Sequence, residues 1–177
     1  MSKFVNDRQK KVLKLLDTSG VRLHALLGRL TLSEDVVGDL MQELFIRLSN
    51  SSGLHKANDP FAYAYRAAIN LAFEWRKKSK VKFQSLDEDC LPVENNPSPM
   101  AEMVQAEELA QVLDVMMRLN ELARKVVVMH YIEQESYEKI AWRLGKKPQH
   151  IRSVSAKAMA RLRQLLTGVK NLAGSRE

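Results

Sequence analysis

The stretch YEKIAWRLGKKPQHIRSVSAKAMARLRQLL, residues 137–166, decides the fold, because its small and apolar residues have the spacing of a helix-turn-helix. Ala141 is small enough for a second helix to cross closely over the first. Gly145 suits the end of the first helix, where the backbone takes a positive φ, and Ile151 returns to the core six residues later. Pro148 fits the first turn of the next helix, where its missing N–H costs no hydrogen bond. We therefore expect two helices that cross at a tight turn.

The second of these helices has two different faces at about 100° per residue. Its core side consists of Ile151, Ser155, Ala158, Leu162 and Leu165. Its outer side carries donors suited to base edges and phosphates, namely Gln149, Arg152, Ser153, Lys157 and Arg163. No acidic residue occurs in 139–176. Charge alone would also fit a solvated basic helix in a bundle, but combined with the turn spacing it favours DNA binding.

The bulk properties exclude several classes of protein. The chain has 177 residues, 45% of them hydrophobic, which is enough for one large or two small packed domains. No apolar run approaches the roughly 18 residues of a membrane span, and the first residues lack the apolar core of a signal peptide, so we expect a cytoplasmic protein. The four histidines are scattered and predict no metal site. The single cysteine, Cys90, has acidic neighbours that do not favour a reactive thiol.

Charge divides the chain into three parts. Residues 1–80 contain 14 Lys and Arg against 8 Asp and Glu, residues 81–110 contain 1 against 7, and residues 111–177 contain 13 against 6. The acidic part includes SLDEDCLPVENNPSP, residues 85–99, which has three prolines and no periodicity and is typical of an extended linker. We predict an all-α protein with two small helical domains, 1–80 and 100–170, joined by an acidic flexible linker over 81–99.

The first predicted domain contains a helical pattern over 4–30, with a break at Gly20, followed by a helix that Ser33 caps and that ends near Leu48. The apolar arc of this second helix consists of Val37, Leu40, Met41, Leu44 and Leu48. Its opposite side consists of Asp35, Asp39, Gln42, Glu43 and Ile46. An apolar side chain among carboxylates and an amide suits protein docking, although taken alone such a face is more often only solvated.

A loop is predicted over 49–58, before a helix that Asp59 caps, Pro60 opens and that ends near Lys78. Its core side consists of Phe61, Tyr65, Ala68, Ala72 and Trp75. Its other side combines aromatic, amide and cationic groups at Tyr63, Arg66, Asn70, Phe73 and Lys77. Such a set suits unstacked bases, although aromatic residues at helical spacing are more often core. Further helices are expected over 99–117 and 120–132.

Two stretches resemble a known family. DLMQELFIRL, residues 39–48, followed by YRAAINLAFEWRKK, residues 65–78, resembles region two of bacterial RNA polymerase sigma factors. LNELARKVVVMHYIEQESYEKIAWRLG, residues 119–145, and the helix after it are similar to region four. The order of the two motifs and the short chain indicate the extracytoplasmic-function (ECF) group. This resemblance implies a sigma factor that binds core RNA polymerase and promoter DNA and is often held by an anti-sigma factor.

The resemblance also implies roles for individual residues. It implies contact with core polymerase for Asp39, Gln42 and Glu43, and we add Ile46 because it lies on the same helix face. It implies that Asn70 holds a flipped base of the minus-10 element, beside a specificity loop over 49–59. We therefore expect the other residues of the same helix face to contact this element too, namely Tyr63, Arg66, Phe73 and Lys77. It implies contact with the minus-35 element for Gln149, His150, Arg152, Ser153 and Lys157. Three residues depart from the family pattern, namely Ile69, Asn120 and Lys146.

Two other functions remain open from the residues alone. One is a stand-alone helix-turn-helix regulator that binds operator DNA without polymerase. The other is a helical interaction module whose basic faces bind an acidic protein. No nucleophile paired with a base and no phosphate-binding glycine loop is recognisable, so the sequence does not predict an enzyme or a cofactor.

Overall fold

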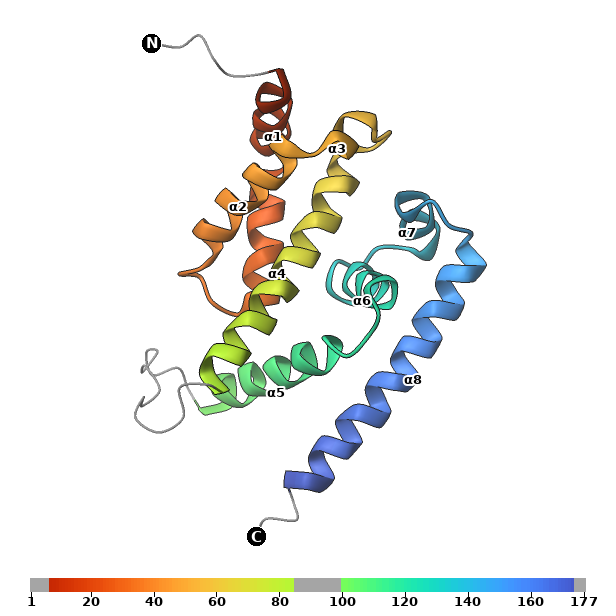
Figure 1. Cartoon of the computed structure of the whole chain (residues 1–177). Helices are drawn as coiled ribbons and strands as arrows, with labels where there is room; N and C mark the ends of the chain where they lie inside the picture. The colour runs from red at the N-terminus through yellow and green to blue at the C-terminus, as the bar shows by residue number, and fades with distance from the viewer. Residues whose placement is uncertain (1–6, 85–99, 174–177) are drawn as a thin grey trace. The chain divides into compact units, whose positions relative to one another are not determined.

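The computed structural model describes residues 7–84 and 100–173, and within them the chain is helical and contains no strand (Figure 1). This confirms the predicted all-α fold. In the first half the helices are α1 (Asp7–Thr31), α2 (Val37–Asn50), α3 (Ser52–Lys56) and α4 (Pro60–Gln84). In the second half they are α5 (Met100–Met116), α6 (Glu121–Val127), the π-helical segment η1 (Val128–Ile132), α7 (Tyr137–Leu144) and α8 (Pro148–Ala173). Among these helices none is long and apolar enough to cross a membrane.

The chain divides into two compact units, Met1–Trp75 and Arg76–Glu177. The boundary falls within α4, whose last turns belong to the second unit. The predicted domain limits of 1–80 and 100–170 remain predictions, and the greater part of the predicted linker, including Cys90, lies outside the described residues. The expected end of α4 near Lys78 was wrong, because residues 79–84 contain no proline or glycine and continue the helix.

The first unit is built on α1 packed against α2, with α4 adding the rest of its core. The α1 side chains at Leu23, Leu26, Leu27 and Leu30 are all fully buried, as are Leu44 on α2 and Tyr65 on α4. The predicted break at Gly20 was wrong, since α1 is continuous through it. A glycine within a helix costs only about 1 kcal/mol, which the burial of the leucines outweighs.

The start of α2 also differs from the prediction. Leu32 ends α1 with a positive φ of 57°, and the backbone N–H of Ser33 donates to Thr31 Oγ1 at 3.4 Å. The Ncap residue is Val36, which makes no side-chain cap bond, so the expected cap at Ser33 was wrong. The cap at Asp59 is confirmed, because its Oδ1 accepts from the backbone N–H of Ala62 at 2.9 Å.

In the second unit, α5, α6 and α7 all pack against α8. The Asn120 side chain caps α6 by accepting from the backbone N–H of Ala123 at 2.8 Å, which is the structural role of the asparagine that departs from the family pattern. The guanidinium of Arg124 donates to the carbonyls of Met116, Met117 and Leu119, at 3.0 to 3.3 Å. These bonds satisfy carbonyls at the end of α5 and the turn after it, so they fix where α6 begins.

Candidate nucleic-acid and polymerase interfaces

The turn between α7 and α8 has the geometry that the sequence predicts. Gly145 has φ 62° and ψ 40°, and its N–H donates to the Trp142 carbonyl at 3.3 Å. The N–H of Lys146 donates to the Ala141 carbonyl at 2.9 Å, which completes a Schellman motif. Lys146 therefore closes the turn normally, although the family usually has an apolar residue there.

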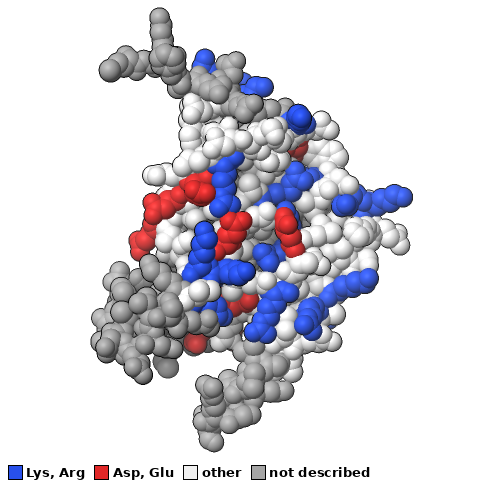
Figure 2. All heavy atoms as spheres, viewed as in Figure 1, with Lys and Arg blue, Asp and Glu red and all other residues white. Residues whose placement is uncertain are grey.

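The two faces of α8 are sorted as the sequence predicts. Ile151, Ser155, Ala158 and Leu162 are buried, whereas Leu165 is only half-buried. The predicted DNA-contacting residues are all exposed on α8, and these are Gln149, His150, Arg152, Ser153 and Lys157. Along α8, the face visible in Figure 2 shows blue Lys and Arg side chains and no red Asp or Glu side chain among them. This exposed surface, defined by the five residues above, is called the α8 face below.

A buried ion pair joins the last turn of α7 to the segment that leads into it. Glu135 precedes the Ncap of α7, and its carboxylate accepts from Nη1 of Arg143 in the last turn of the same helix. The two side chains are only 4% and 6% exposed. Lys139 adds a second, largely exposed cation, with Nζ 3.4 Å from Glu135 Oε1. Because a buried carboxylate needs a partner, this pair fixes α7 relative to the chain that leads into it.

Tyr137, the first residue of α7, connects the two helices of the motif. Its hydroxyl lies 3.3 Å from Oγ of the buried Ser155 on α8. One aromatic neighbour is His130, stacked at 4.1 Å between ring centroids, and the guanidinium of Arg152 lies 5.9 Å from the centre of the Tyr137 ring. The sequence prediction did not assign a role to Tyr137. The available signal was its position directly after Ser136, which caps α7.

A basic groove of about 400 Å³ lies beside the α8 face, between α8 and the turn that joins α5 to α6. Its floor includes the nearly buried Leu119, and its cations are Arg118, Lys157 and Arg161. No acidic residue lines it. Lys157 belongs to both surfaces, so the groove extends the α8 face with positive charge. The sequence prediction did not include Arg118, which the fold brings here from 39 residues before Lys157.

The α4 surface predicted to contact unstacked bases is present only in part. Tyr63, Arg66 and Asn70 are half-buried and Lys77 is exposed. Phe73 is 2% exposed, so its predicted place on this surface was wrong. Its ring contributes to the core, which follows the general rule that an aromatic residue at helical spacing is packed inside. Ile69, where the family often has arginine, is fully buried as well.

Tyr63 also organises the predicted loop over 49–58, which contains the short helix α3. Its hydroxyl lies 2.6 Å from Oγ of Ser51, and the same Oγ accepts from the N–H groups of Gly53 and Leu54 at the start of α3. Arg66 lies with its guanidinium carbon 5.7 Å from the centre of the Tyr63 ring. A Cβ at Gly53 would lie 2.9 Å from the Tyr63 hydroxyl, so a glycine is required for this close approach. The loop and the α4 surface therefore form one ordered structure.

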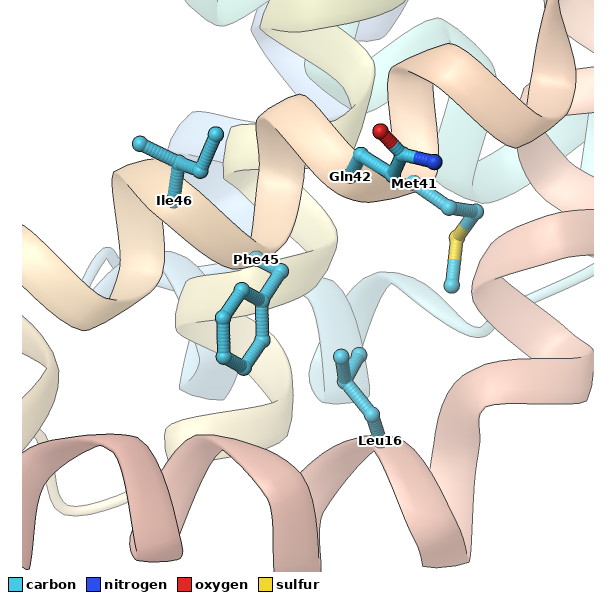
Figure 3. Close-up of a pocket in the computed structure, with 5 residues that line it drawn as sticks. All are labelled: Leu16, Met41, Gln42, Phe45 and Ile46. Atoms are coloured by element: carbon cyan, nitrogen blue, oxygen red, sulfur yellow. The ribbon is translucent and has the colours of Figure 1, made fainter. Parts of the chain in front are cut away.

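The α2 surface predicted to dock on a protein includes an apolar pocket. Asp39, Gln42 and Ile46 are exposed, and Ile46 remains 52% exposed. Figure 3 shows Leu16 of α1 pointing toward α2 beneath Met41, Gln42, Phe45 and Ile46, and these five residues line a pocket of about 390 Å³. The sequence prediction assigned Met41 to the core and did not include Leu16 or Phe45. The pocket arises where two helices meet, so no single periodic pattern indicates it.

Glu43, on the same surface, belongs to a network of ion pairs with Arg47 and Glu74. Arg47 Nε donates to Glu43 at 2.7 Å, and Arg47 Nη1 lies 2.8 Å from Glu74 on α4. The hydrogen bond that Arg47 donates to Glu43 raises the pKa of Arg47, as do its bond to Glu74 and the charge of Glu74, although burial partly opposes them. Glu43 therefore presents its carboxylate in a fixed position beside Gln42.

In the second unit, residues 115–164 span the end of α5, all of α6, η1 and α7, and the greater part of α8, and they match the family model for sigma-70, region 4. Over this region the chain is therefore similar to sigma factors. It is 36% identical over 107 residues to the RNA polymerase sigma-E factor of Streptomyces coelicolor, an alignment that covers 59% of the chain and 56% of that protein. It is 25% identical over 144 residues to the probable RNA polymerase sigma factor RfaY of Xanthomonas campestris pv. campestris, covering 77% of the chain and 36% of that protein.

The chain thus spans about half or less of the length of these curated relatives. Among solved structures it is similar to the sigma factor RpoE of Bartonella quintana in complex with the anti-sigma factor NepR, with 19% identity, coverage of 89% and 98% of the two chains and a TM-score of 0.49. It is also similar to CnrH in complex with the cytosolic domain of CnrY, with 21% identity, coverage of 92% and 91%, and a TM-score of 0.49. Among its described residues no group of three His, Cys, Asp or Glu side chains could hold a metal ion.

Proposed function

We propose that this chain is a sigma factor of the extracytoplasmic-function group that binds core RNA polymerase and directs it to a restricted set of promoters. The observation that carries the proposal is the helix-turn-helix of the second unit, whose exposed α8 face is basic and free of acid and which lies inside the region 4 match. The motifs of region two in the first unit support it further. The protein acts in the cytoplasm and has no catalytic role of its own, since catalysis belongs to the polymerase.

The α8 face contacts the minus-35 element. Arg152 presents a guanidinium suited to the O6 and N7 atoms of guanine, and Gln149 presents an amide suited to adenine. Lys157 and the cations of the basic groove hold the flanking phosphates, because they lie to one side of the reading residues.

The α4 surface contacts the minus-10 element through Tyr63, Arg66, Asn70 and Lys77. An amide beside an aromatic ring suits a base that has left the stack, since such a base exposes both its hydrogen-bonding edge and its ring. The hydrogen bond between the hydroxyls of Tyr63 and Ser51 supports this role, because it holds the predicted specificity loop against the same helix.

The α2 surface binds the largest subunit of core polymerase through Asp39, Gln42, Glu43 and Ile46. An apolar pocket with polar residues at its rim is the usual anatomy of a protein interface. An anti-sigma factor is a further proposed partner, on the strength of the group resemblance alone.

A stand-alone regulator is the second candidate, because the helix-turn-helix by itself supports operator binding equally well. Titration of the purified full-length chain into labelled core polymerase separates the two. We expect saturable binding to core polymerase that the Ile46→Asp variant weakens. A chain that binds duplex DNA but not core polymerase would instead be the regulator.

A further inference from the structure

Arg152 is held in place by two neighbours on α7. Its Nη2 donates to Oε1 of Glu138, and its guanidinium lies over the ring of Tyr137. Tyr137 is itself fixed, because its hydroxyl contacts the buried Ser155 on α8. Arg152 and Glu138 are 56% and 60% exposed, so the pair lies at the surface beside the rest of the α8 face.

A carboxylate in this position is unexpected for a surface that binds a polyanion. Residues 139–176 contain no acid, so Glu138 is the last negative charge before the α8 face. An exposed ion pair stabilises a protein by only about 0–1 kcal/mol, which is a weak reason to place an acid there. Its proximity to Arg152 must, however, reduce the attraction of that arginine for phosphates.

A guanidinium has five N–H donors in a fixed plane. The bond to Glu138 uses one of these N–H groups and leaves others that can donate to a base edge. A preorganised arginine loses less side-chain entropy when it makes a bidentate contact. Weaker attraction for phosphates lowers non-specific binding, and a preorganised guanidinium strengthens the contact with a base. Both effects therefore raise sequence specificity.

We propose that Glu138 is a specificity-determining residue of the α8 face, which holds Arg152 for a directional contact with a base and weakens its non-specific attraction for phosphates. The inference rests on the proposed DNA binding by α8. It assigns to α7 a part in choosing the sequence as well as in packing.

The test selects sequences from a randomised duplex library with the full-length chain at several salt concentrations. Arg152→Ala first identifies the base-pair position that Arg152 reads, as the one position where enrichment is lost. Glu138→Gln should lower the preference at that same position by roughly tenfold and raise the affinity for mismatched duplexes. Its plot of log affinity against log salt should also steepen by about 0.9 for one additional neutralised phosphate.

Two further variants isolate the cause. Glu107→Gln removes an equal charge from an exposed position on α5 and should change neither the preference nor the salt slope. Glu138→Asp keeps the charge on a shorter side chain and should keep the wild-type salt slope. Helix content, measured by circular dichroism, should be the same in all variants.

The outcomes are distinguishable. A wild-type chain that enriches no sequence would overturn the proposed DNA binding and the inference with it. If the wild type enriches a sequence and Glu138→Gln changes neither that enrichment nor the salt slope, the inference about Glu138 is overturned but the proposed DNA binding is not. Equal loss of preference at every position, together with lost helix content, would also overturn it, because Glu138 would then be only structural.

Discussion

The buried pair between Glu135 and Arg143 provides the sharpest test of how the first helix of the helix-turn-helix is anchored. Glu135→Gln keeps the shape of the side chain but removes its charge, and so leaves the Arg143 guanidinium buried beside a neutral amide. Both side chains are less than 7% exposed, so water cannot compensate for the missing charge. Removing one partner of a buried ion pair typically costs about 3–5 kcal/mol. The amide oxygen can still accept one hydrogen bond, so we expect the lower end, about 3 kcal/mol.

Hydrogen exchange measured by mass spectrometry reads this effect in the second unit alone, which avoids the assumption that two units unfold in one step. A loss of about 3 kcal/mol corresponds to exchange of the α7 amides that is over 100-fold faster. Lys139→Ala removes the exposed cation from the same carboxylate and should cost about 0.5 kcal/mol, or about twofold in exchange. Equal, small changes in both variants would refute the argument that burial makes the Arg143 pair structurally decisive.

Three further predictions concern other parts of the chain. Gln42→Ala combined with Glu43→Gln should weaken binding to core polymerase at least tenfold in a fluorescence titration, since Gln42 lines the α2 pocket and Glu43 lies beside it. Asn70→Ala should slow promoter melting, followed by a fluorescent base analogue in the minus-10 element, more than it weakens initial duplex binding. Asp114→Asn should lower the free energy of unfolding at neutral pH, and the difference from wild type should shrink as the pH falls below about 4.

The sign of the Asp114 effect follows from its partners. Burial alone would raise the pKa of Asp114, but hydrogen bonds from Arg76 at 2.7 Å and Lys80 at 3.0 Å, together with their charges, lower it below its usual value. A lowered pKa in the folded state contributes stability above the pKa of the unfolded state, and protonation of the folded state removes it. A difference between wild type and variant that stayed constant down to pH 2 would contradict the assignment.

Controls make the two functional predictions specific. Glu34→Gln, at an exposed position before α2, should leave core binding unchanged. For Asn70→Ala, a pre-melted promoter should largely restore binding. A defect equal on duplex and pre-melted templates, traced to weaker core binding, would make Asn70 a structural amide.

The helix-turn-helix could be predicted closely because its turn is set by local chemistry. Gly145 takes the left-handed conformation and Ile151 is fully buried, as their spacing indicated. The exposed residues of α8 followed from the same periodicity. Local signals decide these features, so a single sequence is enough.

The errors lie where a tertiary contact overrides a local signal. Gly20 suggested a break, but Val12 before it and Leu23 after it are both fully buried, so the core holds α1 as one continuous helix. Phe73 lies on the side of α4 that carries polar groups, yet the core takes up its ring. The Glu138–Arg152 pair and the pocket under Ile46 join residues from different helices. Such pairings depend on how helices cross, which periodicity within one helix does not contain.

The most direct measurement of the central claim is transcription by purified core RNA polymerase on genomic fragments, with and without the full-length chain. We predict transcripts with discrete start sites that appear only when the chain is added, and that Arg152→Ala and Asn70→Ala both reduce. The same transcripts in the presence and absence of the chain, despite confirmed folding of the protein, would contradict its function as a sigma factor.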